Sequence, residues 1–584
     1  MKKLFYGDNL QILREQIGDE SVDLIYLDPP FNSKRDYNLL FKTPKGYESD
    51  AQITAFEDTW HWGEQAQDEF REIEQGKNTQ VAEMMRALRN YLGENDMMAY
   101  LTMMANRLLE MHRVLKPTGS LYLHCDPTAS HYLKIVLDGV FGKENYRNEI
   151  IWKRSYAHSD GAQGSKHFGR ITDTIFFYTK SDEAQWNVLY GAYDESYVER
   201  DYRRLDEDGR RYRLDNIQGP GGAQKGNPSY EVMGVTRYWR YSKEKMDQLI
   251  KAGRIIQTSP GTVPQYKRYL DEMPGVPVQN LWDDLPVINN RAKEYLGYPT
   301  QKPLALLKRI IEASSNENDV VLDPFCGCGT ALDAAQELKR NWIGIDITHL
   351  AISLIEKRLL NRYPELKSGR LKTVRPELVE GSRDATSAST GSARTNVRDA
   401  TSASTGSART DLFEVIGVPQ DFAGARDLAE RDKHQFQLWA CALVNVQPYR
   451  GGKKGADQGI DGMGFIEVAK SKTEKVLVSV KGGEHVGASM IRDLKGTVER
   501  EKAAIGLFVT LTPPTKPMTT EAASAGHYES PHHGAFPRIQ ILTIQGLLDG
   551  TERPHWPDLS FGEQNFKKAK AAGKNAKQKG LFEE

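Results

Sequence analysis

The 584-residue sequence has few cysteines, no long apolar run and almost no net charge. Its four cysteines, Cys125, Cys326, Cys328 and Cys441, are too scattered for a disulfide framework, which favours a reducing compartment. No apolar stretch approaches the roughly 18 residues of a membrane-spanning helix, and the opening MKKLFYGDNLQIL lacks the apolar core of a signal peptide. We therefore expect a cytoplasmic, soluble chain of two or three domains. Since the formal net charge is −1, any affinity for nucleic acid must come from local patches.

Strand and helix patterns alternate over residues 1–40, 97–150 and from Pro303 onward, which predicts a parallel α/β sheet. Residues between about 148 and 295 instead mix short strands, glycine clusters and aromatics, and they are predicted to be an insertion between the two halves of the sheet. The predicted elements include strands at Ser21–Asp28, Ser120–His124, Val320–Asp323 and Asn341–Asp346, and helices ending near Leu115 and Ala313.

A perfect repeat, RDATSASTGSART, occupies residues 383–395 and again 398–410. Serine, threonine, alanine and glycine cannot fill a core, so residues 366–410 are predicted to be a low-complexity linker. Composition becomes globular again over 411–560, which predicts a second domain. The lysine-rich residues 561–584 are predicted to be a basic tail.

A glycine-rich turn follows an apolar strand in VVLDPFCGCGTALDAA, residues 320–335. Gly327 and Gly329 let the backbone approach a ligand, and the helix that follows offers unpaired N–H groups. About twenty residues later the next strand ends in Asp346, a position from which an acid accepts hydrogen bonds from ribose hydroxyls. The pattern indicates an adenosyl ligand. Spacing alone leaves a nicotinamide dinucleotide open, although GxGxxG is missing.

A second strand ends in LDPPFN, with Asp28, Pro29, Pro30 and Phe31. Hydride transfer by a dehydrogenase does not require this cluster, whereas methyl transfer to an exocyclic amine does require it. Hydrogen bonds from the amine to Asp28 and to the Pro29 carbonyl would draw the nitrogen toward sp³ and free its lone pair. Phe31 would stack on a base taken out of its helix.

These motifs, together with GDN at residues 7–9 and YPTQKP at 298–303, resemble the β-class amino-methyltransferases of DNA. The resemblance covers about residues 1–365 and is to the adenine-specific branch, like the modification subunits of Type III restriction systems. It implies a Rossmann-like methyltransferase sheet with a DNA-recognition insertion, S-adenosyl-L-methionine as cofactor, and double-stranded DNA as substrate. It also implies a homodimer or a restriction subunit as partner. Aspartate at residue 28 favours adenine N6, whereas serine there would favour cytosine N4. An RNA or protein amine remains an alternative acceptor for the same chemistry.

The same resemblance assigns cofactor-binding roles along the chain. Asp8 would approach the cofactor's adenine and Asp346 its ribose, although Asp8 would serve equally well as a helix N-cap. The remaining members of the cofactor set are Lys302, Pro303, Asp323, Phe325, Gly327 and Gly329.

A basic and aromatic segment, residues 232–268, lies inside the predicted insertion. Basic side chains interleaved with aromatics suit contacts with DNA, and Arg237, Trp239 and Arg240 are the candidate contacts. The alternative for Trp239 is a simple core position.

The second domain contains GIDGMGFIEV and then KVLVSVKGG, which resemble the PD-(D/E)xK fold of Mrr-like restriction endonucleases over about residues 411–550. The resemblance implies an α/β domain in which Asp461 and Lys481 act with Mg²⁺. Ser479 replaces the expected second acid, which weakens a metal site unless Glu430 or Glu467 supplies a carboxylate. A nuclease and a silent DNA-binding module therefore both stay open.

Overall fold

The computed structural model describes residues 1–30, 36–42, 48–57, 60–155, 166–289, 292, 294–296, 298, 300–370, 412–449, 459–469, 472–530 and 534–556. Within these ranges, side chains are not described at 36–42, 48–57, 368–370, 467–469 and 472–473. The predictions for Phe31, for the repeats and for the basic tail fall outside the described residues. No helix in the described part of the chain has the length and apolarity needed to cross a bilayer.

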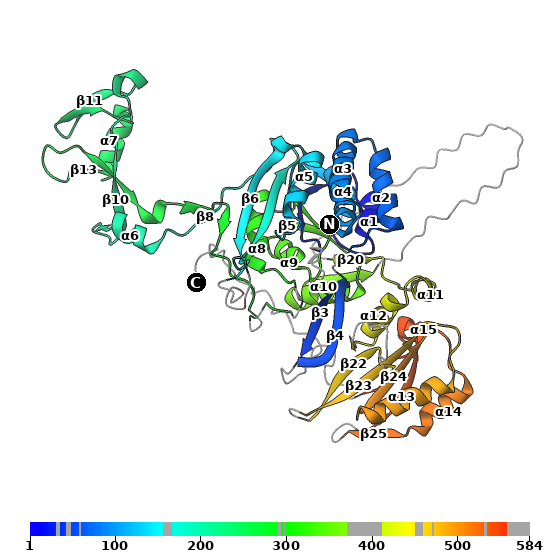
Figure 1. Cartoon of the computed structure of the whole chain (residues 1–584). Coiled ribbons are helices and arrows are strands. Elements are labelled where there is room, and N and C mark those ends of the chain that lie inside the picture. Colours follow the sequence, from blue (N-terminus) through cyan, green and yellow to red (C-terminus); the bar gives the residue numbers. More distant parts are fainter. Residues whose placement is uncertain are drawn as a thin grey trace, which may run out of the picture. The chain divides into compact units, whose positions relative to one another are not determined.

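A ten-stranded sheet, counted over the described residues, organises the first of two units, which comprises residues 1–187 and 280–573 (Figure 1). Its strand order is β16-β6-β7-β5-β2-β17-β18-β1-β20-β19. β7 runs antiparallel to both of its neighbours, and the other pairs are parallel. The strands are β1 (Lys2–Tyr6), β2 (Val22–Leu27), β5 (Leu115–Cys125), β6 (Tyr146–Lys153), β7 (Thr172–Thr179), β16 (Leu281–Trp282), β17 (Val320–Asp323), β18 (Asn341–Asp346), β19 (Lys367–Arg370) and β20 (Leu412–Ile416). The predicted Rossmann-like α/β class is confirmed.

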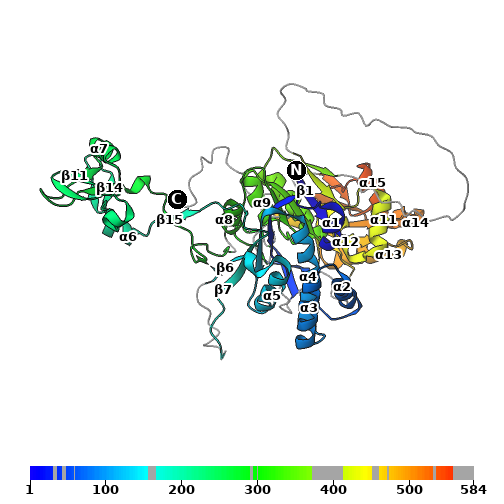
Figure 2. The ribbon, with the colours of Figure 1, turned by 90° about the horizontal axis from the view of Figure 1, so that it is seen from above.

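Helices cover both faces of this sheet (Figure 2). Leu121 and Leu123 of β5 belong to the core beneath the first group of helices, whereas the hydroxyl of Tyr122 lies 2.7 Å from that of Ser314 in the second group. Successive residues of β5 thus face opposite helix layers. The first group is α1 (Asn9–Gln16), α2 (Glu64–Gln75), α3 (Thr79–Leu92), α4 (Asp96–Val114) and α5 (Ser130–Phe141), and the second is α8 (Leu304–Ser314), α9 (Thr330–Glu337) and α10 (His349–Arg362). A separate hairpin joins β3 (Asp36–Lys42) to β4 (Glu48–Glu57).

The start of β5 differs from the sequence prediction. The strand begins at Leu115, directly after α4, and runs through the Lys-Pro-Thr-Gly segment that was expected to precede it. β5 pairs with β2 at Val22↔Leu115 and next at Leu24↔Ser120, so β5 has more residues than β2 between these two pairs. The Lys-Pro-Thr-Gly segment therefore forms an irregularity in the ladder.

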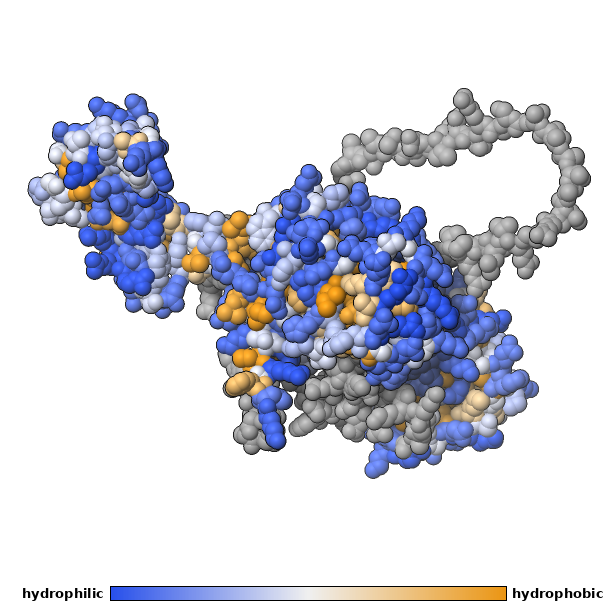
Figure 3. Space-filling model, turned by 45° about the horizontal axis from the view of Figure 1, so that its top comes forward, coloured by the Kyte–Doolittle hydropathy of each residue, from blue (hydrophilic) through white to orange (hydrophobic). Residues whose placement is uncertain are grey.

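The second compact unit spans residues 188–279. A four-stranded sheet of order β13-β14-β10-β9 and the β11–β12 hairpin surround a small core that contains Ile217, Trp239 and Met246, and β8 pairs separately with β15. The view in Figure 3 shows a mostly hydrophilic surface on this unit. Its elements are β8 (Tyr190–Gly191), α6 (Glu195–Asp201), β9 (Arg204–Leu205), β10 (Arg211–Asn216), β11 (Ser229–Val232), β12 (Val235–Tyr238), α7 (Lys243–Lys251), β13 (Ile255–Ile256), β14 (Gln265–Tyr269) and β15 (Val276–Pro277). The unit is narrower than the predicted insertion, because β6, β7 and β16 pair within the main sheet.

The C-terminal part of the first unit has its own five-stranded sheet, of order β21-β22-β23-β24-β27. The predicted α/β class of this region is confirmed, but its expected start at residue 411 is not a clean boundary, because β20 pairs with β1 of the large sheet. The remaining elements are α11 (Phe422–Arg431), α12 (Lys433–Leu443), β21 (Gln447–Pro448), β22 (Gly462–Ala469), β23 (Lys472–Lys481), α13 (Ala488–Arg500), β24 (Ile505–Thr510), α14 (Lys516–Ser524), β25 (His527–Ser530), β26 (Gly534–Pro537), β27 (Ile539–Thr543) and α15 (Ile544–Asp549).

Candidate active site

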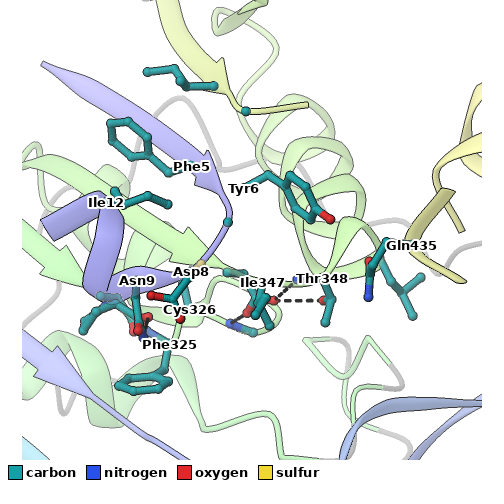
Figure 4. A pocket seen from close by; sticks show the side chains of 18 of the residues that line it. Phe5, Tyr6, Asp8, Asn9, Ile12, Phe325, Cys326, Ile347, Thr348 and Gln435 are labelled. Atoms are coloured by element: carbon teal, nitrogen blue, oxygen red, sulfur yellow. Dashed lines mark hydrogen bonds between the residues drawn. The ribbon is translucent and has the colours of Figure 1, made fainter. Parts of the chain in front are cut away.

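A cavity of about 1710 Å³ lies at the carboxyl ends of β1, β2, β17 and β18. This is the edge at which open α/β sheets bind ligands. Figure 4 shows side chains from β1, the glycine-rich turn, the end of β18 and α12 around the pocket. Of the residues predicted for the site, its walls contain Asp8, Asp28, Pro29, Pro30, Lys302, Asp323, Phe325, Gly327 and Asp346.

The glycine-rich turn needs glycine at two positions. Gly327 and Gly329 have φ of +48° and +75°, and a Cβ on Gly329 would lie 2.8 Å from Ile355 Cγ1. Gly329 does not itself line the cavity; it is the N-cap of α9. Pro303 also lies outside the cavity wall, at the N-cap of α8. These two residues shape the site from the ends of the helices beside it, and their contact with a cofactor stays a prediction.

Asp346 fixes the loop after β18 against the glycine-rich turn. Its Oδ1 accepts hydrogen bonds from the amide (2.9 Å) and hydroxyl (2.8 Å) of Thr348, and its Oδ2 accepts one from the amide of Gly327 (2.9 Å). Burial raises the pKa of Asp346 to about 6, although these hydrogen bonds act in the opposite direction. Asp323, at the end of β17, is buried, and this burial raises its pKa well above the usual range.

Asp28 presents one carboxylate oxygen without a partner. Its Oδ2 accepts a hydrogen bond from Nζ of Lys302, whereas its Oδ1 is buried and has no hydrogen-bond partner within the described residues. Buried polar atoms nearly always have partners, so this oxygen is suited to an N–H donor that enters the cavity. The cavity brings together Asp28 and Lys302, which are 274 residues apart in the sequence.

Asp8 is the N-cap of α1, which was one of the two roles predicted for it. Its Oδ1 accepts hydrogen bonds from the amides of Leu10 (2.9 Å) and Gln11 (3.2 Å), and its Oδ2 accepts one from Arg107 (2.9 Å). The carboxylate still lies in the cavity wall, so capping does not exclude a contact with a ligand.

A buried chain of hydrogen bonds beside Asp28 is not apparent in the sequence. The hydroxyl of Tyr26 lies 3.2 Å from Nδ1 of His124, and Nε2 of the same ring lies 3.2 Å from Asp173, which Arg154 contacts at 3.0 Å. Burial acts to raise the pKa of Asp173, but the hydrogen bond and charge of His124, together with Arg154, lower it overall. The members come from β2, β5 and β7 and the residue after β6, and only strand pairing brings them together.

Two of the three predicted DNA contacts are exposed in the second unit. Arg237 and Arg240 are exposed, and each donates a hydrogen bond to a backbone carbonyl, of Thr236 and Gln218 respectively. Trp239 is fully buried, and its indole N–H donates to the carbonyl of Tyr230 (2.8 Å). The prediction that Trp239 contacts DNA is therefore wrong, because its ring forms the core of the unit.

Among the described side chains, the nuclease-like residues are not grouped as metal ligands. Asp461 Oδ1 accepts a hydrogen bond from Gln437 (2.9 Å) and Oδ2 accepts one from the amide of Val480 (2.7 Å), with Nζ of Lys481 at 3.8 Å. Ser479 is buried and Glu430 is exposed. Over the described side chains, which exclude that of Glu467, no group of three His, Cys, Asp or Glu could hold a metal ion. The described residues therefore give no support to the possible Mg²⁺.

Two family models match separate parts of the chain. Residues 22–357 match the N6_N4_Mtase model, described as DNA methylase. Residues 434–549 match the model described as NACHT-associated inactive Restriction Endonuclease 1. The second match agrees with the nuclease-like fold predicted for this region and with its incomplete set of metal ligands.

Three curated relatives are similar to the first region. The Type II methyltransferase M.EcaI of Enterobacter cloacae is 31% identical over 298 residues, which are 48% of this chain and 65% of the relative. The StyLTI Mod subunit of a Type III restriction-modification enzyme, from Salmonella typhimurium, is 27% identical over 350 residues, 57% of this chain and 49% of the relative. The DNA adenine methyltransferase YhdJ of Escherichia coli is 25% identical over 398 residues, 65% of this chain and 95% of the relative. The chain thus spans less than two thirds of the length of the first two.

Proposed function

The chain belongs to the N6/N4 family of DNA methylases, and from this premise we propose that it transfers a methyl group from S-adenosylmethionine to the N6 amine of adenine in double-stranded DNA. The observation that carries the proposal is the buried Oδ1 of Asp28 in the cavity wall, which has no hydrogen-bond partner among the residues that the structure describes. An oxygen in this state calls for a donor such as the N–H of an exocyclic amine.

The cavity residues fit the cofactor. A volume of about 1710 Å³ exceeds the roughly 300 to 1000 Å³ of a pocket for one small ligand, so it has room for a cofactor and a flipped base together. Asp346 would face the ribose, and Phe325 and the turn at Gly327 would hold the methionine part. When bound, S-adenosylmethionine supplies an electrophilic methyl group.

The chain's own residues would prepare the amine for attack. Asp28 Oδ1 and the Pro29 carbonyl accept hydrogen bonds from the two N–H groups, which localises the nitrogen lone pair. Lys302, already paired with Oδ2, holds the carboxylate in place. After transfer, Asp28 is the nearest base for the proton that the nitrogen loses.

Adenine is preferred to cytosine for two reasons. Aspartate, not serine, occupies residue 28. In addition, a relative aligned over 95% of its own length is named a DNA adenine methyltransferase. The N4 amine of cytosine is the alternative acceptor, since the same contacts would prepare either amine.

Transfer of labelled methyl from S-adenosylmethionine to unmethylated plasmid, followed by nucleoside analysis, tests the proposal. We expect label in N6-methyladenine, and we expect Asp28→Asn to lower the rate by about 10²- to 10³-fold through loss of a charged acceptor. Asp182→Asn is the matched control, because Asp182 lies on the surface with 90% of its side chain exposed. Label in N4-methylcytosine would correct the base, and no transfer to DNA would overturn the proposal.

For the C-terminal region we propose a nuclease-like module that binds DNA without cutting it, within a restriction-modification system whose separate restriction subunit is the partner. The incomplete metal ligands support the first part, and the similarity to a Mod subunit supports the second. Incubation of plasmid with the protein and Mg²⁺ should leave the DNA intact. Cleavage that Asp461→Ala abolishes would contradict the module's assignment.

A further inference from the structure

The C-terminal region is anchored beside the cavity by β20. This strand pairs in parallel with β1, in the register Lys3↔Glu414, Leu4↔Val415 and Phe5↔Ile416. Phe413 is fully buried, with its ring centroid 5.6 Å from that of Trp342 in β18. The chain that leaves β20 therefore starts next to the carboxyl end of β1, at the mouth of the cavity.

The exit from β20 is held tightly against β1. Gly417 has φ of +88°, and a Cβ there would lie 2.3 Å from the carbonyl oxygen of Tyr6. Only glycine allows this approach. Three residues further on, Gln420 lies in the cavity wall, and α11 and α12 follow it.

Polar and apolar contacts then hold α12 on the glycine-rich region. Gln435 Oε1 accepts a hydrogen bond from the amide of His349 (3.2 Å), whose ring stacks on Tyr6 with 3.6 Å between centroids. Leu438 of α12 packs in one cluster with Cys328 of the glycine-rich turn and with Tyr298. Figure 4 shows Gln435 beside Thr348, the residue that hydrogen-bonds Asp346. The C-terminal domain, which follows β20, thus forms part of the pocket that we assign to the cofactor.

Gln420 has an unsatisfied amide in this wall. Its Nε2 is buried and has no hydrogen-bond partner in the described part of the chain. A buried donor without a partner is unfavourable and points to a ligand group. A carboxamide offers one donor and one acceptor side by side, which is the pattern that pairs with the edge of an adenine ring.

The strand order indicates which end of the cofactor reaches Gln420. The glycine-rich turn follows β17 and would hold the methionine part, and Asp346 at the end of β18 would face the ribose. β1 and β20 are the next strands in the same direction. The base of the cofactor would therefore extend over β1 toward the exit of β20, where Gln420 lies.

We propose that the segment from Gly417 to Leu438 is the second wall of the cofactor pocket and that the Gln420 amide reads the adenine edge of the cofactor. This inference rests on the proposed function, since it takes an adenosyl cofactor as the ligand. It gives the nuclease-like domain a role in cofactor recognition that needs neither a metal nor cleavage.

Calorimetric titration of the full chain with S-adenosylhomocysteine and with S-inosylhomocysteine tests the inference. The inosyl analogue carries a carbonyl in place of the amino group on its base. We expect Gln420→Leu to weaken binding of S-adenosylhomocysteine by about tenfold and to reduce the preference over the inosyl analogue. Gln545→Leu is the matched control, since Gln545 is an exposed glutamine of the same domain. Hydrogen exchange should show that S-adenosylhomocysteine protects amides of α11 and α12.

The outcomes separate this inference from the proposed function. If the unmodified chain fails to bind S-adenosylhomocysteine, the cofactor assignment and this inference fall together. If it binds, but Gln420→Leu binds equally well or α11 and α12 gain no protection, the inference alone is overturned. A thermal unfolding curve of Gln420→Leu that matches that of the unmodified chain ensures that weak binding reports on the contact.

Discussion

At the scale of single residues, the site depends on carboxylates in very different surroundings. Asp28 is paired with Lys302 and keeps one oxygen unpartnered among the described residues, whereas both oxygens of Asp346 accept hydrogen bonds from the backbone. The first arrangement suits a group that must meet an incoming N–H. The second suits a group that must hold two loops together.

Asp346 makes the stability of the fold depend on pH. Its pKa is about 6 in the folded chain, against an ordinary value of 3.8, so between these values the folded protein holds a proton that the unfolded chain lacks. The contribution of this group to the free energy of unfolding is therefore complete below about pH 4 and is lost as the pH rises through about 6. We expect the stability difference between the unmodified chain and Asp346→Asn to change by about 1 kcal/mol between about pH 5 and pH 7.

Urea unfolding of both proteins at the two pH values measures this change. Asp182→Asn serves again as the control, because it makes the same chemical change at an exposed side chain. Parallel pH profiles for the unmodified chain and Asp346→Asn would refute the assignment of the titration to this carboxyl.

At the scale of elements, β20 joins the C-terminal domain to the ten-stranded sheet. Phe413→Ala removes a fully buried ring that packs on Trp342, so it should lower the free energy of unfolding by about 3 to 5 kcal/mol. The neighbouring Leu412 is 56% exposed, and Leu412→Ala should change stability by less than about 0.5 kcal/mol. Chemical denaturation gives both values, and equal losses in the two variants would show that β20 is not a packed anchor.

The sequence predicts the parts of the site that lie within one strand and its following turn. LDPPFN and the glycine-rich turn can be recognised in the sequence because proline and glycine have strong local backbone preferences. The Tyr26–His124–Asp173 chain and the position of Gln420 depend on which strands pair, and no local pattern in the sequence encodes that pairing. Trp239 shows the opposite failure, since composition alone cannot tell an aromatic that is buried in a small core from one that faces DNA.

At the scale of the whole molecule, the second unit offers an exposed basic surface. Arg237 and Arg240 are exposed, whereas Arg254, Lys267 and Arg268 are each paired with an acidic side chain. Internal pairing leaves less charge for DNA than the count of basic residues implies.

The double variant Arg237→Ala, Arg240→Ala should weaken DNA binding and lower the slope of log affinity against log salt by about two, if each guanidinium meets one phosphate. Arg200→Ala is the control, because Arg200 is already paired with Asp201. Fluorescence anisotropy over a range of salt concentrations measures both quantities. An unchanged slope would place the DNA-binding surface elsewhere, and affinity for S-adenosylhomocysteine should be the same in all three proteins.

The pairing of β19 with β20 has a consequence for the evolution of the chain. Lys367 and Leu412 are partners in one parallel ladder, so β19 and β20 are held next to each other on either side of the segment that carries both copies of RDATSASTGSART. Gain or loss of a copy changes the length between two anchored points and leaves both strands in register. Loss of one copy still leaves more than the dozen or so residues that a parallel crossover requires. We therefore expect in-frame gain or loss of a copy to leave the pairing of β19 with β20, and the site beside it, intact.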